Sequence, residues 1–473
     1  MANAAAEHFY WYDLETSGTD AAADRIVQFA GQRTDAALAS IGEPFVSYIR
    51  LTPDVLPDPG SCLVTGITPQ RANRDGMEEW QAFRRIRSEL MQPDTCITGY
   101  NNLRFDDHFL RHGFYRNLMD PYVHEWKDGN SRFDIIDLLR AAAALRPKGM
   151  EWPRTEEGEP TFRLEILSEA NGFDHSDAHD ALADVRATLF LARRLRQAQP
   201  KLWEYAFANR LKDSAVPLLL PLGEKVNVHV SRMYPNARHN IAPVVSVARH
   251  PHITNRLIVA DLSRDVSLLL ESDSRALKQA IFTRSEEEPP PLKEITLNRC
   301  PFVAPLKVVG KADAERLGFD FGQIAERHRQ LASAPGLERT IADAYRRDEV
   351  ESEPRDAELS LYDGFLDDGD RREMDRVQNA LEKGLSWPRF SPDDKRVRTL
   401  ATRLKARLRP GELDAAERAE WHEHVAACQQ EGLGRRPSLA EYRERIEHLR
   451  KETTAPESLA VLDELERYQP EPH

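Results

Sequence analysis

The sequence has few features of a secreted or membrane-spanning protein. It contains no apolar run of about 18 residues, the length that a membrane span requires. The opening MANAAAEHFYW lacks a charged segment followed by an apolar one, so we expect no secretion signal. Four cysteines occur, at 62, 96, 300 and 428, and no two form a CxxC pair. Structural zinc is therefore not expected, and a reducing cytoplasm is the default location.

The chain also has fewer basic than acidic residues. The 473 residues carry 65 Lys and Arg against 78 Asp and Glu, which gives a formal net charge of −13. This balance argues against nonspecific binding of polyanions by the whole surface, but it does not exclude a local basic groove. Between Asp348 and Asp370, ten acids accompany one arginine. Such a run favours a solvated linker over a binding site.

The 473 residues are enough for roughly two to four domains, and the 41% of hydrophobic residues is enough to form their cores. Residues 1–200 alternate between strand-like and helical patterns, which predicts an α/β domain. The predicted strands are Phe9–Asp13, Ile26–Thr34, Phe45–Leu51 and Thr95–Asn101. The predicted helices are Glu79–Met91, Asp106–Asn117, Asp134–Leu145 and Asp180–Ala198, the last closed by Pro200.

The secondary structure predicted for the rest of the chain changes twice. Residues 201–352 contain short alternating segments such as VNVHVS and NRLIVADL, which predict a small β barrel or sandwich with helices after it. Residues 355–473 have helical spacing throughout, and Ser438 is a plausible N-cap. The helices expected there are Arg371–Lys383, Lys395–Arg407, Ala415–Glu431 and Ser438–Arg450.

The stretch YWYDLETSG carries two carboxylates, Asp13 and Glu15, in an aromatic strand. Side chains two apart on a strand point the same way, so the two acids repel each other and lose hydration. A bound cation would cancel both penalties. The alternative is that both acids lie at the strand's end and cap the turn that begins at Thr16. This stretch alone does not decide between the two interpretations.

Two further acids and one histidine could complete a metal site. Asp106 follows a buried strand at the start of a predicted helix, and Asp184 lies on the apolar side of the helix that Pro200 closes. His179 precedes Asp184 by five residues in the sequence, and we expect it in the turn before the helix. Carboxylate oxygens suit Mg²⁺ or Mn²⁺, and two such ions about 4 Å apart can drive phosphodiester hydrolysis. The nearby Asp107, Asp174, Asp177 and Asp180 are expected to be turn residues or helix caps, and His175 a solvated loop residue.

Motifs along the whole chain resemble a known family. D-x-E-T at Asp13–Thr16, N-x-x-x-F-D ending at Asp106 and H-x₄-D at His179–Asp184 resemble the DEDD exonucleases of the histidine subclass. TGITP, GYNNLRFDD, RNLMDPY, NSRFDIIDLLRA, ALRPKGMEWP, FRLEILSEANG, AHDALADV and LYDGF extend the resemblance to bacterial exonuclease I. One departure is Leu14, where an aromatic residue can occur; this position should face away from the metals.

The resemblance implies a fold, a reaction and a cofactor. It implies a ribonuclease H-like exonuclease domain at 1–200, an SH3-like β-barrel domain at 201–352 and an α-helical extension at 355–473. It implies Mg²⁺-dependent release of deoxynucleoside 5′-monophosphates from the 3′ end of single-stranded DNA, in DNA repair and recombination, by a cytoplasmic monomer. Asp13, Glu15, Asp106 and Asp184 would hold two metal ions, for which Mn²⁺ could substitute, and His179 would be the general base.

Substrate and partner contacts follow from the same resemblance. The predicted substrate contacts are Glu15, Thr16, Gly66, Arg111, Tyr122, Trp126, Arg140, Phe162 and Arg163. They combine guanidinium groups for phosphates with rings for bases, although aromatic residues are more often core. The resemblance also implies docking of the acidic, hydrophobic-ended tail of the single-stranded-DNA-binding protein, with Arg146, Tyr205 and Arg316 as candidate contacts. A solvated surface charge is an equally good interpretation of the two arginines.

Three other functions remain to be separated from this one. An exoribonuclease could share the catalytic core, but such chains generally lack the residues beyond about 200. A catalytically silent scaffold that binds DNA ends is disfavoured because all five catalytic residue types are present. Polymerase proofreading would need polymerase motifs or a partner, and no such motifs occur in the sequence.

Overall fold

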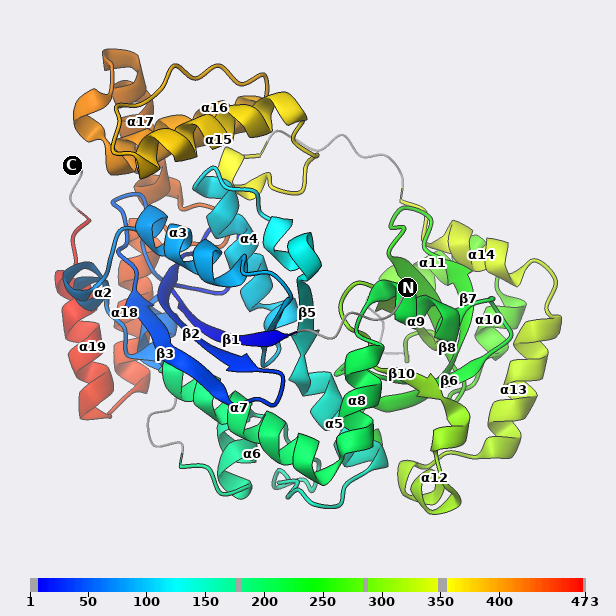
Figure 1. Cartoon of the computed structure of the whole chain (residues 1–473). Helices are drawn as coiled ribbons and strands as arrows, with labels where there is room; N and C mark the ends of the chain where they lie inside the picture. Colours follow the sequence, from blue (N-terminus) through cyan, green and yellow to red (C-terminus); the bar gives the residue numbers. More distant parts are fainter. Residues whose placement is uncertain (1–6, 175–179, 284–287, 348–354, 471–473) are drawn as a thin grey trace. The chain divides into compact units, whose positions relative to one another are not determined.

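The computed structural model describes residues 7–174, 180–283, 288–347 and 355–470 (Figure 1). The chain divides into two compact units. The first unit comprises residues 4–131, 176–186 and 352–473, and the second comprises residues 1–3, 132–175 and 187–351. Among the described residues no helix is long and apolar enough to span a membrane.

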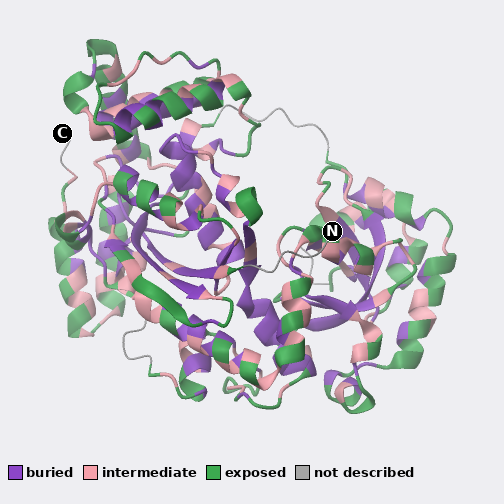
Figure 2. Cartoon of the chain, in the orientation of Figure 1, coloured by how far each residue is buried: buried purple, intermediate pink, exposed green. Residues whose placement is uncertain are grey.

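A twisted sheet forms the centre of the first unit. Its strands are β1 (His8–Thr16), β2 (Ile26–Asp35), β3 (Ser40–Tyr48), β4 (Thr95–Gly99) and the short edge strand β5 (Ser131–Asp134), in the order β3-β2-β1-β4-β5. β1 pairs antiparallel with β2 and parallel with β4, so it lies inside the sheet. Figure 2 shows β1 and β2 buried, whereas most of β3 is exposed.

Apolar and acidic side chains alternate along β1, so they lie on opposite faces of the sheet. Tyr10, Tyr12 and Leu14 belong to a buried cluster with residues of α3 (Glu79–Leu90) and α4 (Asp106–Arg116). Asp13 and Glu15 alternate with them and therefore point to the opposite face. The register of β1 against β2 shifts between Glu15 and Thr16, where the strand ends.

The C-terminal helices are an integral part of the first unit. They are α15 (Asp368–Glu382), α16 (Lys395–Leu408), α17 (Ala415–Glu431), α18 (Leu439–Glu452) and α19 (Pro456–Arg467). Met374 and Val377 of α15 and Leu400 of α16 lie in the same buried cluster as α3 and α4. The indole of Trp80 donates a 2.9 Å hydrogen bond to Gln378. Two short helices, α1 (Pro59–Thr65) and α2 (Pro69–Asp75), complete this unit, and α1 packs on α18 and α19.

A buried charge cluster joins the N-terminal and C-terminal parts of the first unit. The Arg25 guanidinium lies 2.6 Å from Glu358, and Arg407 lies 2.6 Å from both Glu358 and Asp54. The side chains of Asp54 and Glu358 have no exposed surface. The expectation that the acidic run at 348–370 is a solvated linker is therefore wrong for Glu358, and also for Asp370, which is 3% exposed. Composition could not reveal that arginines 25 and 407 meet Glu358.

The acids of this cluster stay ionised because arginines lie beside them. Burial alone would raise the pKa of Asp54 and Glu358, but the arginines outweigh it and hold both pKa values well below the ordinary range. His424 lies 3.7 Å from Asp54, and despite its burial this carboxylate raises the histidine pKa to about 9. Each charge is stabilised by a partner on another element, so removal of one would leave the others uncompensated.

The second unit contains an antiparallel sheet of its own. Its strands are β6 (Val226–Val230), β7 (Ile241–Arg249), β8 (Arg256–Asp261), β9 (Leu292–Thr296) and β10 (Val303–Pro305), in the order β10-β6-β7-β8-β9. Helices α10 (Ser267–Glu271), α11 (Ser274–Phe282), α12 (Lys311–Leu317), α13 (Phe321–Ser333) and α14 (Leu337–Ala344) accompany it. The core of this sheet includes Val244, Val259 and Ile295.

Further helices belong wholly or partly to the second unit. They are α5 (Ile135–Leu145), α6 (Leu164–Ala170), α7 (Ala181–Ala198), α8 (Pro200–Ala208) and α9 (Lys212–Leu219). The short strand β5 (Ser131–Asp134) and helix α7 both cross the boundary between the units. As expected, Pro200 ends the helical run, because α7 stops at Ala198 and α8 starts at the proline.

We predict that Glu358→Gln lowers the free energy of unfolding by about 3–5 kcal/mol, because it leaves two buried arginines short of a carboxylate. Because folding lowers the pKa of Glu358 below 4.5, its contribution is present above that pH and is lost as the pH falls further. Urea denaturation measures the change. Glu326→Gln removes a carboxylate from an exposed ion pair and is the matched control. Equal stability of the two variants would refute the prediction.

Candidate active site

Three carboxylates meet on the face of the sheet opposite α3 and α4. Oxygen atoms of Asp13, Glu15 and Asp184 all lie within 4.8 Å of one another. The first two come from adjacent same-face positions of β1, and the third from the first turn of α7. Glu15 is buried, while Asp13 and Asp184 are half-buried. The structure thus brings together three of the four acids predicted as metal ligands.

The start of α7 is fastened to the sheet, which places Asp184. The Asp180 carboxylate accepts the backbone N–H groups of Leu182 and Ala183, at 3.1 and 3.3 Å, as an N-cap. The Gln28 side chain on β2 donates to Asp180 at 2.9 Å and accepts the Ala181 N–H at 3.2 Å. Asp180 is therefore a helix cap, as expected. Its hydrogen bonds fix the start of α7 and with it the position of Asp184.

The fourth acid, Asp106, opens helix α4 shortly after β4 ends. It is 4% exposed. Its neighbour Asp107 is 1% exposed and accepts a 2.6 Å hydrogen bond from the Tyr12 hydroxyl on the opposite face of β1. Asp107 is predicted to be a turn residue or a helix cap, but the structure shows it buried in the first turn of α4 and hydrogen-bonded to a tyrosine of the sheet.

The pKa values show that the four acids act on one another. Burial, followed by repulsion from Asp106, Asp184 and Glu15, raises the pKa of Asp13 well above the ordinary range. Burial, followed by repulsion from Asp184, Asp106 and Asp180, raises the pKa of Glu15 to about 9. Asp106 therefore belongs electrostatically to the same site. Without a cation the site retains protons near neutral pH.

The donor set fits divalent metal ions. Carboxylate oxygens are the ligands that Mg²⁺ and Mn²⁺ prefer, and like charges this close require a cation or protons. The alternative, that the acids cap the turn after β1, does not match the hydrogen bonds of that turn. There the Thr16 hydroxyl donates to the Gly18 carbonyl at 2.8 Å, and the Ser17 hydroxyl accepts the Arg25 N–H at 2.9 Å.

A second group of possible metal ligands already has its counter-charges. Atoms of Asp54, Glu358 and His424 also lie within 4.8 Å of one another. Arg25 and Arg407 contact both carboxylates, so a metal ion there would have to displace two guanidinium groups. Charge neutralisation distinguishes this cluster from the one at Asp13.

The predicted general base, His179, lies outside the described residues, as do Asp177 and His175. The described chain resumes at Asp180, four residues before Asp184. The role assigned to His179 therefore stays a prediction.

The predicted substrate contacts of the first unit include one exposed ring. Trp126 is 67% exposed. Arg111 forms a 2.6 Å ion pair with Glu125 and lies over the ring of the half-buried Tyr122, with its guanidinium carbon 5.6 Å from the ring centroid. Arg111 is thus neutralised within the protein and positions the Tyr122 ring. Gly66 ends α1 with φ 66°, a left-handed conformation that favours glycine.

The predicted contacts of the second unit have protein partners of their own. Arg140 is 7% exposed, pairs with Asp137 at 2.7 Å and lies over the Phe162 ring. Phe162 is 9% exposed, which matches the core interpretation of an aromatic residue. The sequence argument that the Arg163 guanidinium needs an anion is met by Glu165, although Arg163 remains 69% exposed.

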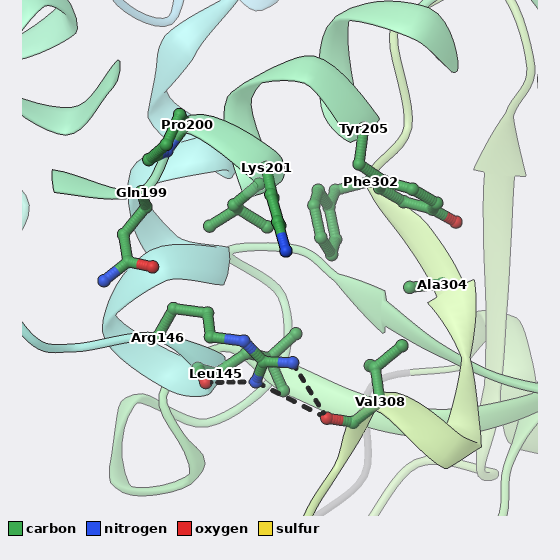
Figure 3. A pocket seen from close by; sticks show the side chains of 10 residues that line it. Leu145, Arg146, Gln199, Pro200, Lys201, Tyr205, Phe302, Ala304 and Val308 are labelled. Carbon is green, nitrogen blue, oxygen red and sulfur yellow. Dashed lines mark hydrogen bonds between the residues drawn. The ribbon is translucent and has the colours of Figure 1, made fainter. Parts of the chain in front are cut away.

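Two predicted partner contacts line an apolar pocket of the second unit with a volume of about 400 Å³ (Figure 3). Tyr205 of α8 and Phe302 form one wall, and the Tyr205 hydroxyl donates to the Val303 carbonyl at 2.8 Å. Arg146 donates to the carbonyls of Leu145 and Val308. Figure 3 shows Arg146 and Lys201 with their cationic ends toward the same opening. Sequence reasoning missed Lys201 and Phe302, because only the fold brings α8 and β10 together.

Arg316, the third predicted partner contact, does not line this pocket. Its guanidinium donates to the Ala144 carbonyl near the end of α5 and to Asp313 at 3.0 Å. Arg316 thus binds the C-terminal end of a helix, a favourable place for a cation.

Comparison with protein families gives three matches along the chain. The family model described as Exonuclease matches residues 10–191. The Exonuclease I SH3-like domain matches residues 210–347, and the Exonuclease I C-terminal domain matches residues 355–471.

Curated relatives match over most of their length. Exodeoxyribonuclease I of Escherichia coli (strain K12) is 40% identical over 420 residues, which cover 88% of each chain. Exodeoxyribonuclease I of Haemophilus influenzae is 39% identical over 422 residues, with 88% of this chain and 89% of the relative covered.

Solved structures share the whole fold. A moderately thermophilic exonuclease I from Methylocaldum szegediense has a TM-score of 0.90 at 42% identity, over 97% of this chain and 98% of that one. Escherichia coli exonuclease I in complex with a dA16 oligonucleotide has a TM-score of 0.92 at 38% identity, over 98% and 99%. Similar structures include a zinc-bound E. coli complex with single-stranded DNA, at 38% identity, and an SSB/exonuclease I structure with the inhibitor CFAM, at 37%.

We predict that the metal-free protein becomes less stable as the pH rises from about 4.5 to about 9. Over this window folded Glu15 holds a proton that the unfolded chain has released, because its pKa is raised from 4.5 to about 9. Thermal unfolding in EDTA at several pH values measures the decline. Mg²⁺ at 100 times its Kd should restore about 2.7 kcal/mol.

The matched variant for this measurement is Glu15→Gln, which cannot titrate. It should show a flatter decline with pH and a smaller response to Mg²⁺ at high pH. Parallel pH profiles for the wild-type protein and the variant would contradict the assignment of the raised pKa to this site.

Proposed function

Because the chain belongs to the exodeoxyribonuclease I family, we propose that it removes deoxynucleoside 5′-monophosphates from the 3′ end of single-stranded DNA. The observation that carries the proposal is the convergence of Asp13, Glu15 and Asp184, with Asp106 raising the pKa of the first two. The E. coli relative in complex with dA16 supports a single-stranded substrate. A role in repair and recombination of DNA would follow from this activity.

Membership of the exonuclease family implies dependence on divalent metal ions, and we propose Mg²⁺ as the ion. Asp13, Glu15, Asp106 and Asp184 would hold two ions, and Mn²⁺ could substitute because it accepts the same oxygen ligands. Two bound ions supply a nucleophilic water and neutralise charge on the leaving 3′ oxygen.

The protein's own residues would perform the remaining steps. His179 would take the proton of the attacking water, and the backbone near Gly66 would approach the terminal sugar. In the first unit, Thr16 and the exposed ring of Trp126 would contact the strand, and Tyr122 would lie beside it. In the second unit, Arg140, Phe162 and Arg163 stay predicted substrate contacts. Arg111 would hold Tyr122 in place.

We also propose that the pocket between α8 and β10 binds the acidic tail of the single-stranded-DNA-binding protein. Its apolar walls suit a terminal aromatic ring, and Arg146 and Lys201 suit the carboxylates. The similar SSB/exonuclease I structure supports such a partner. The domain division at 1–200, 201–352 and 355–473, the cytoplasmic location and the monomeric state stay predictions.

We predict that the protein shortens 5′-labelled single-stranded DNA only when a divalent metal ion is present. Asp184→Asn should slow this reaction by more than about 100-fold, because it removes a direct ligand. A 3′-phosphate should block the reaction, whereas a 5′-phosphate should not. Asp368→Asn, at an exposed acid, is the control. Matched RNA oligonucleotides test the exoribonuclease alternative. Metal-dependent activity of Asp184→Asn at the wild-type rate would refute the site.

For the general base, we predict that His179→Ala lowers turnover by roughly 10²- to 10⁴-fold while DNA binding and Mg²⁺ binding persist. His175→Ala is the matched control, because this histidine has no predicted role in catalysis. Single-turnover kinetics together with Mg²⁺ titration measure both properties. Loss of Mg²⁺ affinity in His179→Ala would show that the residue is a ligand.

For the partner site, we predict that Arg146→Ala weakens binding of an acidic peptide with a terminal aromatic residue by roughly 10- to 100-fold. Lys201→Ala should act in the same direction. Arg316→Ala should weaken binding less, because Arg316 does not line the pocket. Peptide titration by fluorescence anisotropy, with digestion of naked DNA as the control, separates docking from catalysis. Unchanged affinity in both Arg146→Ala and Lys201→Ala would place the tail elsewhere.

A further inference from the structure

The backbone pairing that holds β1 beside β4 ends before the candidate metal ligands begin. The last residue pair of this parallel ladder is Trp11 with Thr98. Asp13 lies two residues beyond that pair on β1. Asp106 lies eight residues beyond it, after the short 3₁₀ turn η1 (Asn102–Arg104). The ladder therefore does not fix where Asp106 lies relative to Asp13.

A buried side-chain hydrogen bond connects the two segments just beyond the ladder. The Tyr12 hydroxyl donates to the Asp107 carboxylate at 2.6 Å, and each side chain belongs to a residue that is 1% exposed. Tyr12 directly precedes Asp13 on β1, and Asp107 directly follows Asp106 on α4. The Tyr12–Asp107 bond thus joins the chain neighbours of two predicted metal ligands that come from different elements.

This bond gives α4 a defined position that apolar packing alone does not give. Tyr12, Phe109 and Leu110 belong to one buried cluster, so α4 is pressed against the sheet by hydrophobic contact. Such contact has no preferred direction, and a small shift of the helix along the sheet buries almost the same area. A hydrogen bond weakens steeply when its distance or angle changes. Bonds between a hydroxyl and a carboxylate at about 2.5–2.7 Å are also among the stronger ones in proteins.

The backbone of β1 is also in close contact with the end of β4 at Tyr12. Gly99 is the last residue of β4, and a Cβ atom added there would lie 2.7 Å from the Tyr12 carbonyl oxygen. Only a residue without a side chain allows this approach. Tyr12 therefore contacts the connection from β4 to α4 at both ends, through its backbone at Gly99 and through its hydroxyl at Asp107.

A bond of this kind could serve the stability of the fold alone. In that case its loss would lower stability and leave the affinity for metal unchanged, as for any buried polar pair. Its place in the chain indicates a second role. Metal ligands are oriented by groups behind them, and loss of such a group typically lowers metal affinity or activity by about 10- to 100-fold.

We propose that Tyr12 and Asp107 are positioning residues, which hold Asp106 where it can share a metal centre with Asp13. The inference rests on the proposed function, because it takes both acids to be ligands of that centre. Tyr12 points to the face of β1 opposite Asp13, so it acts through the bond to Asp107 and not by contact with a metal ion. The start of α4 is thereby placed before any ion binds.

The test is titration of the metal-free full-length protein with Mn²⁺, followed by the electron paramagnetic resonance signal of the free ion. Tyr12→Phe removes the hydroxyl but keeps the ring that stacks on Phe29, and it should raise the Kd by about 10- to 100-fold. Asp107→Asn keeps an acceptor oxygen and should raise the Kd less than Asp107→Ala. Tyr12→Phe should add little in Asp107→Ala, because the same bond is already lost.

A second comparison separates positioning of Asp106 from a general loss of structure. In Asp106→Asn, Tyr12→Phe should change the Kd little, because the ligand that it positions is gone. In Asp184→Asn, Tyr12→Phe should still raise the Kd. Tyr234→Phe is the matched control, since it removes a buried tyrosine hydrogen bond of 2.9 Å to His229 in the second unit. It should lower the melting temperature without changing Mn²⁺ affinity.

Wild-type Mn²⁺ affinity in folded Tyr12→Phe would overturn the proposal and leave the bond a purely structural one. An equal rise of the Kd in the wild-type and Asp106→Asn backgrounds would also overturn it, because the effect would not pass through Asp106. If Tyr12→Phe does not fold, Asp107→Asn takes its place in both comparisons. Wild-type affinity in Asp106→Asn itself would instead remove Asp106 from the ligand set, so that the proposed metal site fails.

Discussion

The repulsion among four carboxylates, two on a buried strand and two at the starts of helices, is the constraint on which this structure depends. Asp13 and Glu15 share a face of β1, and the starts of α4 and α7 add Asp106 and Asp184. Burial and mutual repulsion raise the pKa of Glu15 to about 9, so the arrangement loses stability as it ionises. A divalent cation removes this penalty. In the metal-free form these carboxylates therefore lower the stability of the fold, but the same arrangement places them to bind metal.

The second buried charge cluster contains arginines as well as acids, so its charges need no metal ion. Arg25, Asp54, Glu358 and Arg407 neutralise one another inside the first unit, so the pKa values of the two acids fall. The cluster ties β1–β4 to the C-terminal helices, and the shared core of α3, α4, α15 and α16 does the same. This attachment also holds Tyr362 beside α4, where its hydroxyl lies 3.2 Å from His108.

Local patterns in the sequence predicted much of this, and contacts between distant residues account for most of the rest. The strands at Phe9 and Ile26 and the helices at Glu79, Asp106 and Asp180 were predicted to within a few residues, because periodicity reports burial directly. The outermost strand was expected at Phe45–Leu51 but is Ser40–Tyr48, since an exposed edge strand has little hydrophobic alternation. Helix α19 was missed, although its Leu462 and Leu465 are fully buried. The site acids were predicted from spacing. The burial of Glu358 and the position of Lys201 at the pocket were not, because both depend on residues that are distant in the sequence.

The most direct test of the central claim is to locate bound metal ions. Crystals of the protein soaked with Mn²⁺ and measured for anomalous scattering should show two peaks about 4 Å apart among Asp13, Glu15, Asp106 and Asp184. No peak should occur at Asp54, Glu358 and His424, where arginines already supply the positive charge. Absence of any peak at the first group, in crystals that bind Mn²⁺ elsewhere, would contradict the account.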